Sequence, residues 1–448
     1  MAKAMTLSLG LFLLYIPCAR PQENIAKGEI EVTLHLSVKK ALGYAHSIQL
    51  AKEKITEADK DRSVAISQIF PTISASASIS ERKEAITNVN RLLFGGEPYN
   101  LYDAGISLNQ PLLRGGAYLA GLGISKKEQE IRQMDLEITE RDLISKVVKS
   151  FFKILLDQKK IELVENQIDF QKNLFETTKR KFKQAIGKEL DMYQAQTELE
   201  LLEPQLLQAQ NELKSDVAEF ASIVGIPEKT KIKVTGVPLV IDWQALDKKM
   251  TQLKVRRVEL EKASVAAAQS VDKKDLELSK HFPQVNFFSK IGRSATRRND
   301  LISKEDQNYW SFGVELSIPL FSGLSSVFER QKLASQTAQL ELEEAKLRNE
   351  LALKQVQATQ ELDSTIMVIK ATSRAIESAK KSLAVAKKSY SKGTATYVQL
   401  VDAQRNLSRA ELALEQAQFD RIIKTSEYFT VNGWPLLELV QWLNDRPT

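Results

Sequence analysis

The sequence predicts a mainly α-helical protein with amphipathic strands of the membrane β-barrel type, built from a strand–strand–long helical hairpin unit that occurs twice. The 448 residues contain only 12 prolines and 18 glycines, 27% of them are charged and 7% are aromatic. This composition favours long helices and disfavours a compact globular enzyme. Motifs that recur at a fixed spacing and short segments of alternating polarity complete the prediction.

The amino terminus has the layout of a secretory signal. Lys3 precedes an apolar run over residues 7–16, and small residues follow, in the order of a positive start, an apolar core and a cleavage region. We expect residues 1–19 to be removed on export. Cys18 is a candidate lipidation site, although Pro17 before it fits a lipoprotein signal poorly. No later segment reaches 18 consecutive apolar residues, so no transmembrane helix is expected.

The chain is a tandem duplication. Five positions recur with an offset of 208 residues, namely Gly105, Pro111, Gly115, Phe182 and Gly225, which return as Gly313, Pro319, Gly323, Tyr390 and Gly433. Phe70-Pro71 returns as Phe282-Pro283 with an offset of 212, which places a small length difference before Gly105. We therefore predict a first repeat over 20–227, a second over 228–435, and a tail over 436–448 that joins a belt at mid-height.

Each repeat contains two predicted strands. They cover about 72–80 and 102–111 in the first copy, and about 284–291 and 309–319 in the second. Apolar and polar residues alternate along them, as expected of strands with one apolar and one polar face. The apolar positions include Ile106, Leu108, Trp310, Phe312, Val314 and Leu316. Lipid on one side and water on the other would produce this pattern, and a soluble sandwich would be the alternative.

A long helical hairpin follows each strand pair. The hairpins cover 115–224 and 323–432, and Pro111, Gly115, Pro319 and Gly323 mark the transitions from strand to helix.

Gly187 and Gly393 mark the hairpin tips, which gives an outgoing helix of about 70 residues, or roughly 100 Å, and a shorter return helix. The missing length must come from other helices. We predict that 188–224 stacks end to end on 244–280, and that 37–68 stacks on 396–431.

Four strands cannot close a barrel, and open strand edges leave unpaired backbone groups that lipid does not tolerate. Three chains would supply twelve strands, which is an allowed even number. A homotrimer therefore follows if the strands lie in a membrane.

Three motifs resemble the TolC-type outer-membrane efflux family. They are the duplicated strand motif that ends in Pro-Leu-x-x-Gly, the tip motif over 389–404, and the Val-Gly-Ile-Pro sequence at the end of the first copy, and the similarity covers about 37–438. The resemblance implies a trimeric twelve-strand barrel in the outer-membrane lipid and a twelve-helix periplasmic tunnel. It also implies docking to a periplasmic adaptor (membrane fusion protein) and an inner-membrane transporter of RND, ABC or MFS type. The channel would serve multidrug efflux or type I secretion, without chemistry or a cofactor.

The resemblance also assigns roles at the tips. Asp402 matches an aspartate of a ring at the periplasmic aperture, while the second ring position holds Gln399. Tyr390 matches a latch tyrosine, but the latch arginine is replaced by Ala395. On the first tip, Asp191 matches a latch aspartate.

Phe182 aligns with the tip aromatic, and Gly187 lies two positions later than its counterpart in the second copy. For Asp402 the alternative is a solvated helix face, and for Tyr390 and Phe182 it is ordinary helix packing.

Charge and composition exclude several other functions. The net charge is +6, and basic and acidic residues are interleaved along the chain, whereas a nucleic-acid-binding protein would concentrate its basic residues. One cysteine and three histidines exclude disulfide frameworks and Cys/His zinc sites. We find no catalytic motif and expect no enzyme, no metal and no cofactor. A periplasmic helical scaffold or adaptor, and a channel-like protein that has lost transport, remain as alternatives.

Overall fold

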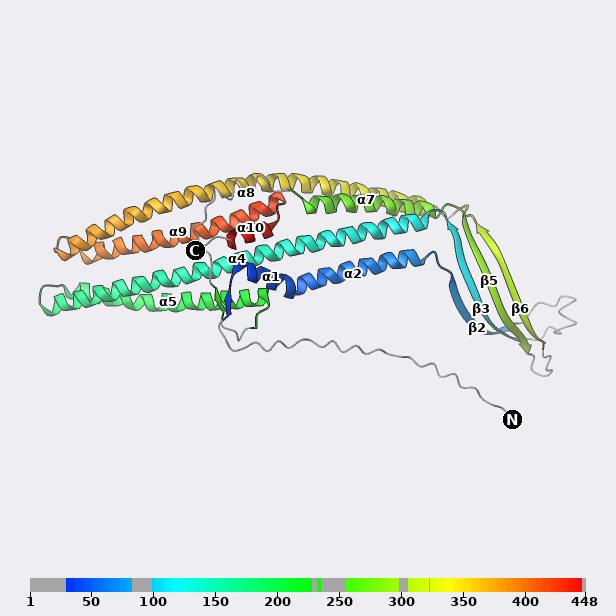
Figure 1. Cartoon of the computed structure of the whole chain (residues 1–448), viewed down its shortest axis with the longest axis horizontal. Coiled ribbons are helices and arrows are strands. Elements are labelled where there is room, and N and C mark those ends of the chain that lie inside the picture. Colours follow the sequence, from blue (N-terminus) through cyan, green and yellow to red (C-terminus); the bar gives the residue numbers. More distant parts are fainter. Residues whose placement is uncertain are drawn as a thin grey trace, which may run out of the picture.

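The computed structural model describes residues 30–82, 99–227, 232–234, 255–297, 305–321 and 323–444. The protein is elongated, with a β-sheet at one end and the tips of two helical hairpins at the other (Figure 1). The predicted signal over 1–19 and Cys18 lie outside the described residues. None of the described helices is long and apolar enough to cross a membrane.

The helices reproduce the duplication in their lengths. Both outgoing helices have 67 residues and both return helices have 36. The helices are α1 (Leu34–Tyr44), α2 (His46–Ser67), α4 (Ala117–Lys183), α5 (Glu189–Val224), α7 (Val258–Ser279), α8 (Ser325–Ser391), α9 (Tyr397–Asn432) and α10 (Leu436–Asn444). The return helices end at glycines in the left-handed region, Gly225 and Gly433, which is the usual way to terminate a helix.

The end-to-end stacking differs from the predicted one. The amide of Arg256, just before α7, donates a hydrogen bond of 3.0 Å to the carbonyl of Gly433 at the end of α9. A Cβ on Gly225, at the end of α5, would lie 2.0 Å from the Tyr44 ring at the junction of α1 and α2. Thus α9 meets α7, and α5 meets α1 and α2 (Figure 1). The predicted stacking of 188–224 on 244–280, and of 37–68 on 396–431, is wrong.

Strand pairing explains this arrangement. The helix α2 leads into β2 (Thr72–Arg82), and β3 (Tyr99–Arg114) leads into α4. Because β2 and β3 are hydrogen-bonded neighbours, α2 and α4 are neighbours as well. The return helix α5 runs back along the same side of α4 that α2 covers nearer the sheet. The helices α5 and α2 therefore meet halfway along α4 (Figure 1).

The sheet contains four antiparallel strands in the order β2-β3-β5-β6, with β5 at Gln284–Arg297 and β6 at Glu305–Ser317. The strands extend further toward their connecting loops than expected, because backbone pairing continues where the alternation of polarity stops. Pro319 lies beyond β6. Pro111 lies inside β3, past the last β2 pair and at a bulge, where a residue without an N–H is tolerated.

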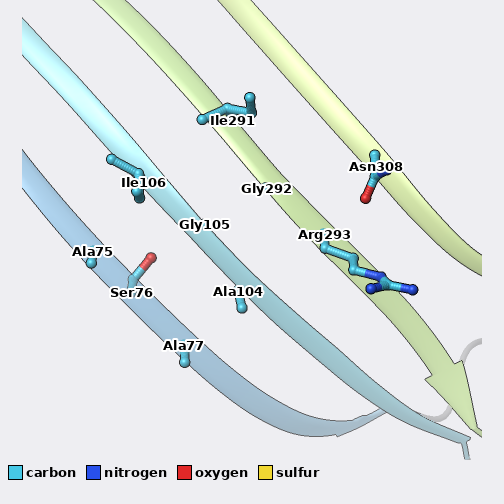
Figure 2. Close-up of a pocket in the computed structure, with 10 residues that line it drawn as sticks. All are labelled: Ala75, Ser76, Ala77, Ala104, Gly105, Ile106, Ile291, Gly292, Arg293 and Asn308. Atoms are coloured by element: carbon cyan, nitrogen blue, oxygen red, sulfur yellow. The ribbon is translucent and has the colours of Figure 1, made fainter. Parts of the chain in front are cut away.

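The two faces of the sheet differ sharply. One cross-strand row consists of Ala75, Ile106, Ile291 and Trp310, and the next row on the opposite face consists of Ser74, Ser107, Lys290 and Ser311. On the apolar face, Trp310 is 72% exposed and stacks on Phe312. Small residues leave a shallow depression in the sheet beside Ile106, Ile291 and Arg293 (Figure 2). A single chain therefore leaves its most apolar surface uncovered.

Glycines on the polar face make room for an aromatic side chain. A Cβ on Gly292 would lie 2.5 Å from the Tyr309 hydroxyl, and one on Gly105 would lie 3.2 Å from it. Tyr309 crosses β5 above these glycines and donates a hydrogen bond of 2.8 Å to Asp103 on β3. The ring thus lies along the sheet instead of projecting from it.

The main apolar core lies at mid-height. It contains Phe151 and Phe152 of α4, Phe220 of α5 and Phe429 of α9, all fully buried. The short helices α1 and α10 pack there (Figure 1), together with the parallel pair β1 (Ile30–Val32) and β4 (Ile232–Val234). These segments form the belt around the hairpins, and α10 brings residues 436–444 into it.

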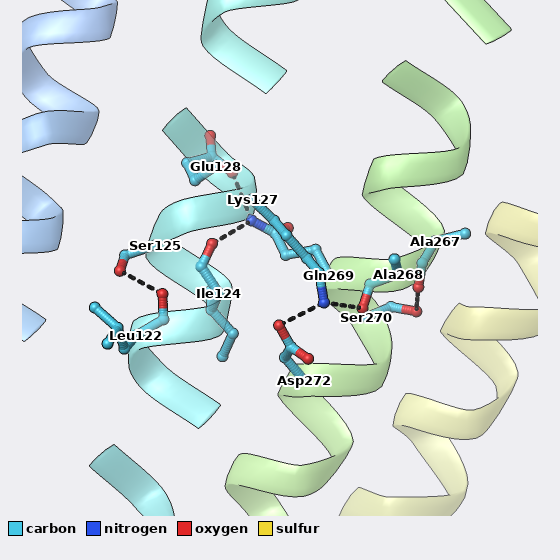
Figure 3. A network of polar contacts seen from close by, with 10 residues as sticks. All are labelled: Leu122, Ile124, Ser125, Lys127, Glu128, Ala267, Ala268, Gln269, Ser270 and Asp272. Atoms are coloured by element: carbon cyan, nitrogen blue, oxygen red, sulfur yellow. Dashed lines mark hydrogen bonds and ion pairs between the residues drawn. The ribbon is translucent and has the colours of Figure 1, made fainter. Parts of the chain in front are cut away.

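Polar contacts replace this core between the belt and the sheet. Gln269 of α7 is buried and donates to the carbonyl of Ile124 and to Glu128 on α4, and Lys127 pairs with Asp272 at 2.7 Å (Figure 3). The residues of α7 that are buried are all polar: Gln269, Ser270, Glu277 and Ser279. Directional hydrogen bonds therefore fix the helix register in this half.

Two buried carboxyl groups face each other between α4 and α5. Asp157 is 7% exposed and Asp216 is 8% exposed, and Lys153 binds Asp216 at 2.8 Å. Among the described residues no donor reaches Asp157 Oδ2, so a proton is needed for its hydrogen bond to Asp216. Burial first, and then this hydrogen bond, raise the pKa of Asp157 to about 7. Hydrogen bonds from Asp157 and Lys153 lower the pKa of Asp216, although burial acts in the opposite direction.

The second copy shows which part of this cluster the hairpin requires. The Lys153–Asp216 pair is repeated with its charges exchanged as Glu361–Lys424, at 2.9 Å. Asp157, however, is replaced by Thr365. The salt bridge between the outgoing and return helices is thus common to both hairpins, whereas the protonated carboxyl belongs to the first one alone.

This difference predicts a pH-dependent stability. The native state keeps a proton on Asp157 that the unfolded chain releases near its ordinary pKa of 3.8, so the free energy of unfolding falls as the pH rises from about 4 to about 7. We expect Asp157→Asn to reduce this fall and to raise the thermal midpoint at pH 8 more than at pH 5, followed by circular dichroism in detergent. Asp363→Asn, at an exposed position of α8, is the control. An unchanged pH dependence in Asp157→Asn would contradict the assignment.

Candidate functional site at the hairpin tips

The two tips have the same backbone turn. In the first, the amides of Ile186 and Gly187 donate to the carbonyl of Lys181, and in the second those of Thr394 and Ala395 donate to that of Ser389. These pairs again differ by 208 residues. The turn needs one residue in the left-handed region, which is Gly393 with φ +76 in the second tip and Ala185 with φ +59 in the first.

The counterpart of Gly393 is therefore Ala185, not Gly187. Gly187 has a different role, because a Cβ there would lie 2.8 Å from the Cβ of Lys181. A glycine is needed at position 187 because Lys181 packs too closely to leave room for a side chain, and not because of a positive φ. Ala185 is left in a conformation that costs an L-residue roughly 1 kcal/mol.

Gln399 has a local structural task. Its amide donates to Thr396 Oγ1 at 3.3 Å, and its side-chain oxygen accepts from the amide of Thr396 at 2.9 Å. This capping box satisfies two amides at the start of α9. Helix capping thus gives Gln399 a structural role at the position where the resemblance implies a ring aspartate.

Tyr390 connects the two tips. It is half-buried beside the tip core of Leu174, Leu383 and Tyr397, and the ammonium of Lys181 lies 4.2 Å from its ring centre. Burial, followed by the charge of Asp191, raises the pKa of the Tyr390 hydroxyl. Asp191 thus lies close enough for its charge to act on Tyr390, whereas the direct contact of Tyr390 with the first hairpin is the one with Lys181.

Phe182, the first-copy counterpart of Tyr390, is 36% exposed and lies outside the tip core. Ala395 contributes only its backbone to the turn.

A buried glutamine joins three helices and was missed from the sequence. Gln171 of α4 donates to the Tyr397 hydroxyl of α9 at 2.7 Å and to the carbonyl of Ala195 in α5 at 3.1 Å. Burial above all raises the pKa of Tyr397 to about 12, so this hydroxyl stays protonated. Tyr397 directly follows Thr396, a residue type that often caps helices, but nothing in the sequence links Tyr397 to Gln171.

Asp402 lies next to a second link between the hairpins. Arg405 of α9 binds Glu198 of α5, and the Asp402 carboxylate lies 3.8 Å from the same guanidinium. The Asp402 side chain is 57% exposed. It lines a groove of about 360 Å³ between α5 and α9, with Tyr193, Val398 and Arg405. The carboxylate is thus accessible but partly compensated within its own chain.

The tip turns predict opposite effects for opposite substitutions. Ala185→Gly removes the left-handed strain and should stabilise the first tip by about 0.5–1 kcal/mol. Gly393→Ala introduces the strain and should destabilise the second tip by about 1 kcal/mol, because its Cβ meets no atom within 4 Å and only the backbone term remains. Hydrogen exchange of the tip amides would measure both.

Ala384→Gly, about two turns before the end of α8, is the control for glycine flexibility and should destabilise by about 1 kcal/mol. If Ala185→Gly behaved like this control, Ala185 would not be strained.

Comparison with known proteins places this architecture in a family. The model of the family described as "Outer membrane efflux protein" matches residues 37–226 and 250–426. Outer membrane protein TolC of Vibrio cholerae is 25% identical over 348 residues, which cover 75% of this chain and 77% of the relative. The alkaline protease secretion protein AprF of Pseudomonas aeruginosa is 22% identical over 341 residues, covering 72% and 67%.

Solved structures share the fold. The outer membrane protein VceC of Vibrio cholerae superposes with a TM-score of 0.75 at 15% identity, over 90% of this chain and 96% of that one. The outer-membrane channel OprN gives 0.74 at 19% identity, over 90% of both chains. These matches bear out the mainly helical, duplicated strand–strand–hairpin fold. Its family, its two-faced sheet and its paired hairpins make this chain an outer-membrane efflux channel with no enzymatic role, a member of the outer membrane efflux protein family.

Proposed function

We propose that three copies of this chain form a passive duct that carries substrates from the periplasmic side to the outside. The observation that carries the proposal is the sheet: within the described residues β2 and β6 each have one unpaired edge, and one face is apolar and exposed. Three sheets joined edge to edge would close a twelve-stranded barrel and remove every open edge. The α-helical hairpins would then continue the barrel as a tunnel of twelve helical columns.

The duct needs partners that supply substrate and energy. We propose a periplasmic adaptor and an inner-membrane transporter, which would meet the hairpin tips. The name of the relative AprF refers to protein secretion, which supports type I secretion as one use of such a duct; efflux of small molecules is the other. The duct itself would perform no chemistry.

We propose that the tips form the closed end of the duct. Tyr390, Asp191 and the Arg405–Glu198 pair would hold the two hairpins of each chain together, and Asp402 would face the entrance. Opening would require these contacts between the first hairpin (α4 and α5) and the second (α8 and α9) to separate. Of the two ring positions that the resemblance implies, one holds Gln399, which is engaged in its capping box. Asp402 would therefore supply the carboxylate at the entrance.

The duct is tested by assembly and conductance. The detergent-purified protein should have the mass of a trimer by light scattering and should produce discrete, low-conductance openings in a planar bilayer. A monomer that stays soluble in water without detergent would contradict the proposal. Trimers that insert but never conduct would instead favour a channel-like protein without transport.

The gate is tested in the same bilayers. Arg405→Ala breaks the link between α5 and α9 and should raise the conductance or the fraction of time open. The control, Arg409→Ala, removes an exposed arginine one turn further along α9 and should leave both unchanged. Asp402→Ala should reduce the preference for cations and the block by divalent cations, because it removes a carboxylate from each chain at a constriction. Openings indifferent to Arg405 and Asp402 would remove these residues from the gate while leaving the duct intact.

A further inference from the structure

The hairpin tips concentrate the positive charge of the chain. The equivalent segments 179–192 and 387–400 contain eight basic and two acidic residues, a net charge of +6, which equals the net charge of all 448 residues. The basic residues are Lys179, Arg180, Lys181, Lys183, Lys188, Lys387, Lys388 and Lys392. The interleaving of charges expected from the sequence therefore holds for the chain as a whole but fails at its distal end. We call these eight residues the basic tip.

The basic tip is not neutralised by its own chain. Throughout the described residues, salt bridges form along the hairpins, but none involves a member of the basic tip. Lys181 and Lys387 lie over the rings of Tyr390 and Phe170, and Arg180 donates to a backbone carbonyl. Lys183, Lys188 and Lys392 are exposed, and no carboxylate of the described residues lies within salt-bridge distance of them.

Helix physics explains only part of this charge. Cations in the last turn of a helix interact favourably with its dipole, which accounts for Arg180, Lys181 and Lys183 in α4 and Lys388 in α8. The same effect opposes Lys188, which is the N-cap residue of α5 and makes no capping hydrogen bond. A cation at this position faces the positive end of the helix and leaves amides without an acceptor.

The duplication shows the alternative at the same position. The counterpart of Lys188 is Thr396, whose side chain completes a capping box. A threonine cap is worth about 1 kcal/mol relative to a residue that cannot cap. Lys188 therefore costs the first tip the stability of this cap, which the second tip retains. Glu189 and Asp191 in the first turn of α5 interact favourably with the helix dipole, but they do not replace the missing capping hydrogen bond. A cost of this kind is typical of a residue kept for binding.

An exposed apolar residue lies within the basic tip. Ile186 is 74% exposed at the first turn, between Lys183 and Lys188. An apolar anchor surrounded by charged residues is the usual composition of a protein interface. Phe182, Leu190 and Val398 of the same two segments are exposed as well. Polar and charged residues are interspersed among these apolar residues, whereas binding to a membrane surface would need a continuous apolar helix face.

We infer that the basic tip is a docking surface for a carboxylate-rich protein surface, the acidic end of the periplasmic adaptor. This inference rests on the proposed function, because it assigns the chemistry of a partner already placed at the tips. Complementary charge would accelerate the encounter and set the register of docking, and both effects would weaken with salt. The exposed cations at the tip outnumber the carboxylates, so the docking surface is basic even though Asp402 lies two residues beyond the segment 387–400.

The test uses a defined probe with the detergent-purified full-length channel. The probe is a synthetic two-helix hairpin whose turn carries six glutamates, and its matched control carries six glutamines. Biolayer interferometry should show binding of the glutamate probe at least about tenfold tighter than the glutamine probe, and a loss of about tenfold or more between about 50 and about 300 mM NaCl. Equal binding of the two probes would overturn the inference.

Variants assign the effect to the tip. Lys183→Gln, Lys188→Thr and Lys392→Gln combined should weaken binding of the glutamate probe by about tenfold. The control combines Lys39→Gln, Lys52→Gln and Lys54→Gln, which remove three exposed charges from α1 and α2, and should bind like the wild type. Equal losses in both triple variants would mean non-specific attraction and would overturn the inference.

A stability measurement separates binding from folding. Lys188→Thr alone should slow hydrogen exchange of the first amides of α5, because it copies the Thr396 cap, while it weakens probe binding. Weaker binding together with faster exchange would point to a damaged tip and would contradict the assignment.

A lipid control tests whether the partner is a protein or a membrane. Vesicles that contain phosphatidylglycerol should bind the wild-type channel more weakly than the glutamate probe does; tighter, lysine-dependent binding would assign the tip to anionic lipid instead.

A conductance control separates the docking surface from the duct. All variants should conduct in planar bilayers as the wild type does. Normal conductance without selective binding of the glutamate probe would overturn the inferred docking surface alone. A wild-type channel that does not conduct would count against the proposed duct.

Discussion

A 67-residue helix needs a partner along its whole length, and this requirement organises the molecule. The return helix of each hairpin has only 36 residues, so it covers the distal half of α4 or α8 and leaves the proximal half bare. The helix that precedes the strands of the same copy fills that half, α2 beside α4 and α7 beside α8. The two helices of each column meet at Gly225 in the first copy and at Gly433 in the second, where the absence of a side chain allows close contact.

Burial is distributed unevenly along these columns. The belt contains the large apolar side chains, and a smaller core closes the tips. Between them, and between belt and sheet, the helices are joined by hydrogen bonds and ion pairs, including the Asp157–Asp216 carboxyl pair. Polar contacts of this kind fix register at a modest gain in stability.

The tips depart from helix physics at two positions. Ala185 adopts a left-handed conformation that glycine would adopt more easily, and Lys188 occupies a cap position that threonine fills in the other copy. Both departures lie in the first hairpin, and the second hairpin retains the favourable residue at each site. Within a duplicated chain, one copy serves as the control for the other, and the unfavourable residues are the ones that call for a functional explanation.

The sequence by itself determined the repeated unit, the strand pairs, the hairpins and the position of their tips, because helix and strand periodicities and capping residues act over a few neighbouring residues. It also singled out Tyr390, Asp191 and Asp402. Only the tertiary structure decided that α5 stacks on α1 and α2 and α9 on α7, that Ala185 replaces Gly393 in the first turn, and that Gln171 and Arg405 link the hairpins. Residues in these contacts are separated by up to 226 positions. Their pairing depends on how the sheet orders its strands and on which side of α4 each helix returns, and no local pattern encodes that geometry.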